Sequence, residues 1–219
     1  MAPPQLPPAD DLYLTAHDAS SGRPLLGSAA LGLGLGAALL GELILWRRID
    51  LISAGLVVTD KRPTGDTATT ALLERILREA DRRGLRDWLA RLATGSATDL
   101  VGRRLARGGL IRRVERRGLL GTRSSFVPAD AMTAAWPATR IRTKVAGSEP
   151  LNVPDLLVSG LIRATGLDRQ VLAALTARDR DRLSEQSRRD LPAELQQLVA
   201  QVEAAVVVAP FRPMWRPGS

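Results

Sequence analysis

The chain has 219 residues, enough for one large domain or two small ones, and carries a formal net charge of +8. It contains no cysteine, which excludes disulfides, cysteine zinc sites and a thiol nucleophile. The positive charge, almost entirely arginine, favours an anionic partner such as nucleic acid or a membrane surface. An arginine-rich composition that only solvates the surface is the alternative explanation. Because only 3% of residues are aromatic, leucine, alanine and valine must fill the core.

The two ends of the chain have the composition of tails. Residues 1–10 are rich in proline and have no basic residue before an apolar region, so we expect no signal peptide and place the protein in the cytosol. Residues 210–219 contain three prolines. We predict that residues 1–10 and 210–219 are disordered and that residues 11–209 form a single domain.

The segment from Leu25 to Leu45 forms the centre of the predicted fold. No side chain between Leu25 and Gly41 is charged, although a quarter of the chain is. A membrane-spanning helix needs about 20 apolar residues, whereas this run is shorter and contains five glycines, and a continued span would bring Glu42 into the bilayer. We therefore predict a helix buried in a globular core, whose glycines let neighbouring helices approach closely.

The segments that follow are mostly helical. Residues 49–60 are rich in β-branched side chains and end in a turn, which predicts a short strand or hairpin. Residues 119–127 predict a second hairpin, turning at residues 122–125. Apolar residues at helical spacing predict the remaining elements. These helices cover residues 67–80, 81–93, 97–107, 110–117, 156–165, 168–177, 179–188 and 192–208.

The residues needed for catalysis are scarce. A single histidine, His17, and the absence of cysteine leave no nucleophile–base pair and no set of metal ligands. Gly32, Gly34 and Gly36 are not followed by the Lys-Ser/Thr pair of a phosphate-binding loop. We therefore expect no enzymatic activity, no cofactor and no metal.

Positive charge is concentrated between Arg103 and Arg117, where seven arginines accompany the single acid Glu115. Arg104 and Arg107 are three residues apart, so their side chains share one face of the predicted helix. Paired guanidinium groups suit a phosphate, because each can donate two parallel hydrogen bonds to its oxygens. A solvated basic face is the alternative.

Four motifs resemble, in order and spacing, those of the Golgi phosphoprotein 3 family, over residues 12–210. They are Glu42–Leu45 with Arg48–Leu51, the turn Pro63–Asp66, Arg116–Leu120 with Phe126 beyond it, and the basic stretch Pro137–Lys144. The resemblance, to a bacterial member, implies a mainly α fold: a central apolar helix bundle surrounded by amphipathic helices, with one or two short β-hairpins. It also implies a non-enzymatic peripheral protein of the cytosolic face of a membrane. Such a protein would bind phosphatidylinositol 4-phosphate or a related phosphoinositide and act as an adaptor for client membrane enzymes.

The resemblance also implies a site. The headgroup ligands would be Arg103, Arg104 and Arg107, and a hairpin projecting toward the lipid would contact the membrane through Arg123, Phe126 and Val127. Two further ligands of the family, an arginine and a tryptophan, fall on Gly36 and near Gly27. These departures favour binding to anionic lipid in general over strict phosphoinositide specificity.

Two other functions fit the same residues. A helix, a glycine break, a second basic helix and a hairpin over residues 97–127 could form a winged-helix DNA reader that uses the Arg103–Arg117 region. No nearby cluster of Asn, Gln or Lys suits base-edge readout, so nucleic acid is the less favoured partner. A scaffold that binds other proteins through amphipathic helices is the third possibility, and oligomerisation is left open.

Overall fold

The computed structural model of the protein describes residues 5–52, 55–79, 84–118 and 121–208, with the backbone alone at residues 115–118, 121–125 and 208. Ten helices and two antiparallel hairpins lie within these ranges, which confirms the mainly α fold. The helices are α1 Pro8–Thr15, α2 Ser28–Leu45, α3 Thr67–Arg78, α4 Leu85–Ala93, α5 Ser96–Arg107, α6 Ala131–Ala146, α7 Val153–Ala164, α8 Asp168–Val171, α9 Ala177–Asp190 and α10 Ala193–Val208. The strands are β1 Ile49–Ile52, β2 Gly55–Val58, β3 Ile111–Gly118 and β4 Gly121–Pro128.

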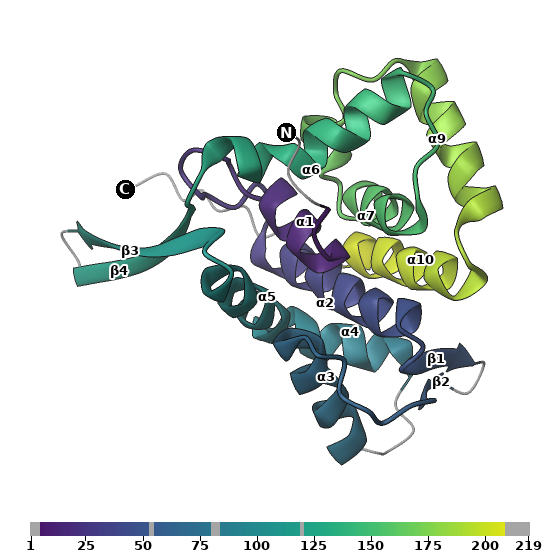
Figure 1. Ribbon diagram of the computed structural model, residues 1–219, viewed down its shortest axis with the longest axis horizontal. Coiled ribbons are helices and arrows are strands. Elements are labelled where there is room, and N and C mark those ends of the chain that lie inside the picture. Colours follow the sequence, from purple (N-terminus) through teal and green to yellow (C-terminus); the bar gives the residue numbers. More distant parts are fainter. Residues whose placement is uncertain (1–4, 53–54, 80–83, 119–120, 209–219) are drawn as a thin grey trace.

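Helix α2 runs through the centre of the molecule, with α1, α4, α5, α7 and α10 packed around it (Figure 1). Thirteen of its residues, 31–43, are buried. A helix that is apolar on every side needs such cover from its neighbours, so the predicted core helix is confirmed. Of the described helices, α2 alone is long and apolar enough to cross a bilayer. Yet 72% of it is buried inside the fold, as in the core helix of a soluble protein.

The glycines of α2 permit the close helix packing that the sequence predicts. A Cβ atom on Gly32 would lie 2.5 Å from the carbonyl oxygen of Ala93, at the end of α4. A Cβ atom on Gly36 would lie 2.8 Å from the Cβ of Leu92 on the same helix. No real Cβ contact is this short, so α2 and α4 cross at a separation that only glycine allows.

We expect the protein to be recovered without detergent, because α2 is covered by other helices rather than by lipid. The measurement is fractionation of expressing cells, followed by a carbonate wash of the membrane fraction. Protein that stays in the membrane after the wash would show that α2 spans the bilayer.

The predicted N-terminal tail is too long. Residues 8–10 form the first turn of α1, and all eight residues of this helix are buried. Pro8 occupies the first helical position, where its fixed φ suits a helix and its missing N–H costs nothing. The folded domain therefore begins inside the predicted tail of residues 1–10, while residues 210–219 lie outside the described residues.

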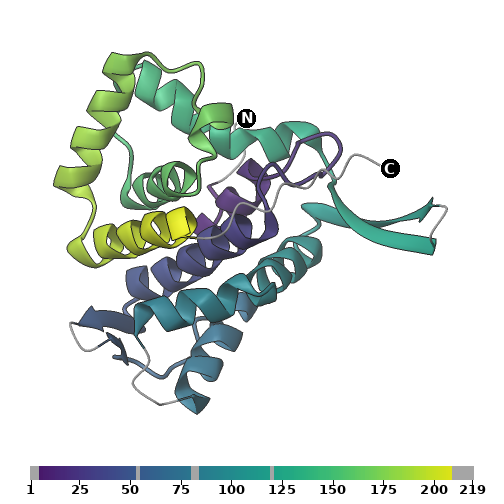
Figure 2. The ribbon, with the colours of Figure 1, turned by 180° about the vertical axis from the view of Figure 1, so that it is seen from behind.

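The basic segment after α5 is a strand, so the predicted helix over residues 110–117 is wrong. Strand β3 pairs along its whole length with β4, from Ile111 opposite Pro128 to Gly118 opposite Gly121. The chain therefore reverses between Gly118 and Gly121, before the predicted turn at residues 122–125. Local spacing did not show this, because the pairing partners lie up to 17 residues apart in sequence. The hairpin extends away from the helices in both ribbon views (Figures 1 and 2).

The other predicted elements are confirmed with shifted bounds, with one exception, and two helices, α1 and α6, were not predicted. The predicted helix over residues 168–177 is only the short α8, Asp168–Val171. Helix α6, Ala131–Ala146, is absent from the predicted helices, and Pro137 lies inside it. Proline removes one backbone hydrogen bond in a helix interior, which usually ends or bends the helix. Burial of Ala134, Pro137 and Ile141 against the rest of the fold stabilises this one.

Candidate functional site

The apolar face of α5 determines where its arginines point. Ala97, Val101 and Leu105 are buried against the core at helical spacing. Arg104 lies three residues after Val101, on this same face, and is only 9% exposed. Arg103 lies on the opposite side, with 70% of its side chain exposed. The three predicted ligands on α5 therefore occupy different environments.

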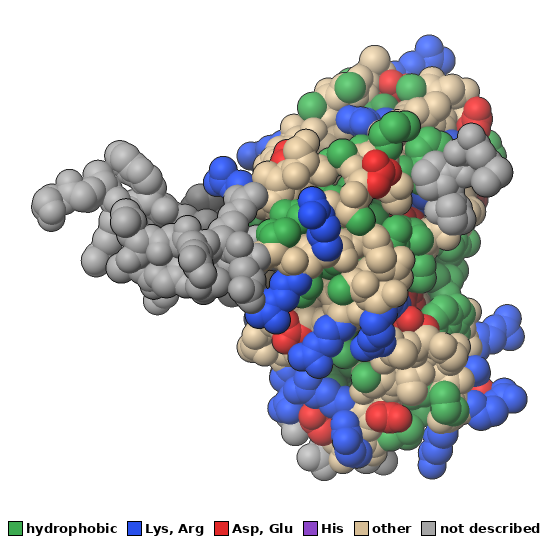
Figure 3. Space-filling model, turned by 60° about the vertical axis from the view of Figure 1, so that its left-hand side comes forward, with side chains coloured by type: hydrophobic (Ala, Val, Ile, Leu, Met, Phe, Trp, Pro, Cys, Tyr) green, Lys and Arg blue, Asp and Glu red, His purple; other side chains and the backbone are tan. Residues whose placement is uncertain are grey.

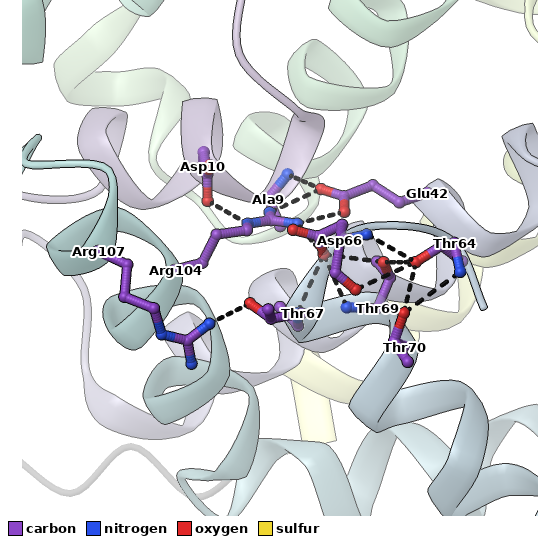
Figure 4. Close-up of polar contacts among 11 residues, drawn as sticks. Ala9, Asp10, Glu42, Thr64, Asp66, Thr67, Thr69, Thr70, Arg104 and Arg107 are labelled. Atoms are coloured by element: carbon purple, nitrogen blue, oxygen red, sulfur yellow. Dashed lines mark hydrogen bonds and ion pairs between the residues drawn. The ribbon is translucent and has the colours of Figure 1, made fainter.

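Arg104 is the centre of a buried ion cluster in which four elements meet (Figure 4). Its Nε donates to Oδ1 of Asp10 on α1 at 2.8 Å. Its two Nη groups donate to the two carboxylate oxygens of Glu42 on α2, at 2.7 and 3.0 Å. Nη1 also donates to Oδ1 of Asp66, the N-cap of α3, at 3.1 Å. The backbone N–H of Ala9 completes the contacts of Glu42, donating to Oε1 at 2.8 Å.

The cluster shifts the protonation equilibria of its members. Burial raises the pKa of Asp10 to about 7, against the lowering effect of the Arg104 charge. Burial also raises the pKa of Glu42, although Arg104 and the N–H of Ala9 bond its charged form. For Asp66 burial is outweighed by the N–H of Thr69 and by Arg104, so its pKa falls. The pKa of Arg104 rises, since the bonds and charge of Glu42 outweigh burial.

Arg104 is therefore placed as a structural residue, contrary to its predicted role as a headgroup ligand. Its guanidinium already bonds Asp10, Glu42 and Asp66, and a phosphate could reach it only by displacing these carboxylates. Periodicity could have revealed this, because Arg104 follows Val101 at the spacing of the buried face.

Arg107, the second predicted ligand, is exposed. Its Nη1 donates to the hydroxyl of Thr67 at the start of α3, and Figure 4 shows this contact beside the Arg104 cluster and not within it. Arg103 lies 3.9 Å from Asp99 in an exposed pair. The structure thus separates Arg104 from Arg103 and Arg107 and does not bring them together as a clamp.

The predicted membrane contacts Phe126 and Val127, at the base of the β3–β4 hairpin, differ in exposure. Phe126 is 37% exposed, whereas Val127 is 7% exposed, so of these two residues Phe126 alone presents much of its side chain to a membrane. Successive side chains of a strand point to opposite faces, and Val127 takes the inward one. A Cβ atom on Gly22, at φ +67°, would lie 2.2 Å from the carbonyl oxygen of Phe126, so the loop after α1 covers this part of β4. The side chain of Arg123 lies outside the described residues.

Exposed cations surround the junction of α5 and β3. We call four of them the basic surface: Arg103, Arg107, and, on the two opposite faces of β3, Arg112 and Arg113. Figure 3 shows the molecule with the left-hand side of Figure 1 turned forward, and many Lys and Arg side chains lie over its lower half. Figure 1 places α3, α4 and α5 in this lower half. Asp99 is the exposed acid on the same helix. This surface can attract anions through charge and through the guanidinium fork.

The basic stretch Pro137–Lys144 proves largely structural. Arg140 is buried and donates from Nη2 to Asp11 of α1 and to Asp155 of α7, at 2.6 Å each. Lys144 donates to the other oxygen of Asp155 at 3.2 Å. This second ion cluster fastens α6 and α7 to α1, and sequence spacing alone did not show it because its members lie up to 144 residues apart.

The structure also bears on the winged-helix alternative and on metal binding. The winged-helix alternative loses its basis, because residues 111–118, where the second basic helix was expected, form strand β3. Among the described residues, no group of three or more His, Asp or Glu side chains could hold a metal ion. His17, the single histidine, is partly buried, stacks on Tyr13 and approaches the Tyr13 carbonyl oxygen with its Nδ1 at 2.7 Å.

A central apolar helix, enclosed by amphipathic helices and accompanied by a basic hairpin, is the architecture expected from the four motifs. The sequence model of the Golgi phosphoprotein 3 (GPP34) family matches residues 9–207. Because the match covers almost the whole chain, the protein belongs to the Golgi phosphoprotein 3 family. No curated protein matches the chain.

Proposed function

We propose that this protein binds anionic phospholipid headgroups as a non-enzymatic peripheral protein on the cytosolic face of a membrane. The observation that carries the proposal is the basic surface, where Arg103, Arg107 and Arg112 are exposed and where Arg113 pairs across the hairpin with the partly exposed Phe126. Arginines next to an aromatic side chain suit the membrane interface, where charge meets the headgroups and the ring meets the acyl boundary.

The ligands in this proposal are Arg103 and Arg107, with Phe126 as a membrane contact. Arg104 contributes indirectly, because it ties α5 to α1, α2 and α3 and so fixes where Arg107 lies. Phosphatidylinositol 4-phosphate is the headgroup to test first, because the family resemblance implies it. An adaptor role for client membrane enzymes rests on family membership alone.

Replacing both Arg103 and Arg107 with alanine should weaken binding to anionic vesicles about 30-fold, since each basic residue near such a surface contributes about 1 kcal/mol. Flotation with phosphatidylcholine vesicles containing phosphatidylserine or phosphatidylinositol 4-phosphate, at matched charge, measures the effect. The control is Arg178→Ala with Arg188→Ala, which removes two exposed arginines of α9, and it should change binding much less.

Three further comparisons sharpen this test. Binding should weaken as salt rises, because exposed charges are screened. Neutral vesicles should bind poorly, and equal binding to neutral and anionic vesicles would contradict the proposal. Binding to duplex DNA, measured in parallel, should fall below binding to anionic vesicles; the reverse order would favour a nucleic-acid function.

A further inference from the structure

Helix α1 joins the two ion clusters of the protein through consecutive acids. Asp10 bonds Arg104 in the cluster with α2, α3 and α5, and Asp11 bonds Arg140 in the cluster with α6 and α7. Both ribbon views place α1 between the group α3–α5 and the group α6, α7 and α9 (Figures 1 and 2). The position of this one buried helix therefore depends on the charge states of two neighbouring carboxyl groups.

The Arg104 cluster has more acids than bases. Three carboxyl groups, from Asp10, Glu42 and Asp66, meet a single guanidinium, so the fully ionised cluster would carry a net charge of −2. Water can stabilise little of this charge, because Asp10, Glu42 and Arg104 are buried. Carboxylates that share a buried site cannot all ionise freely, so one of them retains a proton to higher pH.

The contacts show which carboxyl group that is. Glu42 accepts hydrogen bonds at both oxygens, from Arg104 and from the N–H of Ala9. Asp66 accepts from the N–H groups of Ala68 and Thr69, and its side chain is 20% exposed. Of these donors, only Arg104 donates a hydrogen bond to the Asp10 carboxyl group, at Oδ1. The ionised form is thus stabilised least at Asp10, where the proton would sit on Oδ2.

We propose that Asp10 binds a proton from solvent in the folded protein near neutral pH, which makes α1 a proton-dependent clasp that tightens as the pH falls. This inference goes beyond the proposed lipid binding, because the clasp acts on the fold itself. Loosening α1 would free Arg104 and with it the position of α5, which leads directly into the β3–β4 hairpin.

The pKa shifts of the carboxyl groups on α1 determine how the stability of the fold should change with pH. Asp10 has its pKa raised from 3.8 to about 7, and Asp11 to about 6, both mainly by burial. A carboxyl group whose pKa is higher in the folded state stabilises the fold at low pH, and this contribution is lost as the pH rises toward the folded value. Ionisation of these two groups should therefore lower the stability between about pH 4 and pH 7.

The neighbouring groups add to or oppose this trend. The other ionisable groups around α1 are Glu42 of α2, Asp66 before α3, Arg104 of α5, Arg140 and Lys144 of α6, Asp155 of α7, and His17 after α1. The pKa of His17 is lowered by burial, so its own contribution grows as the pH rises and opposes that of Asp10. A substitution at Asp10 is therefore needed to isolate its part.

The test is thermal unfolding of the full chain between pH 5 and pH 8, for the wild type, for Asp10→Asn and for Asp99→Asn. Asparagine keeps the hydrogen bond from Arg104 and resembles the protonated acid. The Tm of the wild type should fall by about 5–10 °C over this range, and Asp99→Asn, an exposed acid of α5, should follow it. Asp10→Asn should match the wild type near pH 5 and unfold at a higher temperature near pH 8.

Parallel profiles for the wild type and Asp10→Asn would overturn the proposal. If Asp10→Asn does not fold, nuclear magnetic resonance of the wild type is the alternative test. The ¹³C chemical shift of the Asp10 carboxyl group is followed as a function of pH. A midpoint near pH 7 supports the clasp, and a midpoint below pH 5 overturns it. Neither measurement involves lipid, so failure of the clasp and failure of the proposed lipid binding are separate results.

Discussion

Replacing Arg104 with alanine should lower the free energy of unfolding by about 3–5 kcal/mol, the usual loss when one partner of a buried ion cluster is removed. The substitution would leave Glu42, which is 1% exposed, without its charge partner in the core. It would also remove the one side chain that links α1, α2, α3 and α5. Denaturation in urea, followed by circular dichroism, measures the loss.

The matched control is Arg103→Ala, the neighbouring arginine of the same helix. Arg103 is 70% exposed and lies at the limit of pairing distance from Asp99, so its loss should change stability little. Lipid binding should rank the variants the other way round. The folded fraction of Arg104→Ala should bind anionic vesicles better than the double variant Arg103→Ala/Arg107→Ala does. If Arg104→Ala instead keeps full stability and loses vesicle binding, Arg104 is a headgroup ligand and the structural role is wrong.

Replacing Gly32 with alanine should lower the free energy of unfolding by about 1–3 kcal/mol relative to Gly41→Ala, the range typical of overpacking in a core. Both glycines lie in α2, so both substitutions gain the same helix propensity of about 1 kcal/mol. They differ in what the new methyl group meets. At Gly32 it meets backbone atoms of Ala93, and at Gly41 it meets Cδ2 of Leu157 at 2.6 Å.

The difference should arise because backbone at a helix end cannot move without shifting α4, whereas the end of a leucine side chain can take another rotamer. Urea denaturation of both variants measures the difference in their free energies of unfolding, provided that the two m-values are equal. Equal stabilities would mean that α2 and α4 separate at little cost, and that their close approach is not a requirement of this fold.

The environments of the site arginines were harder to predict from the sequence than the helices themselves, and α5 shows why. The sequence places Arg103, Arg104 and Arg107 on one helix, but a count of positive charges does not tell a solvated arginine from a buried one. The carboxyl groups that hold Arg104 come from Asp10 and Glu42, 94 and 62 residues away. Glu42 and Asp66 each belong to a motif that the sequence singled out, Glu42–Leu45 and the Pro63–Asp66 turn, but neither motif showed that its acid would meet Arg104.

Local physics was sufficient for much of the rest. The absence of charge from Leu25 to Gly41 determined a buried α2, since such a segment has no polar face to turn toward water. The spacing of Leu72, Leu73 and Ile76 likewise determined the buried face of α3. These features depend on residues at most a few turns apart, so the sequence by itself was enough to predict them.

Tertiary structure decided what depends on distant partners. Residues 111–118 became a strand because β4 supplied backbone hydrogen bonds along the whole segment. Pro8–Asp10 became helical and buried because Arg104 and Glu42 bind the start of α1. A buried charge is tolerated only where opposite charges and hydrogen bonds surround it, and these come together here only when α1, α2, α3 and α5 pack.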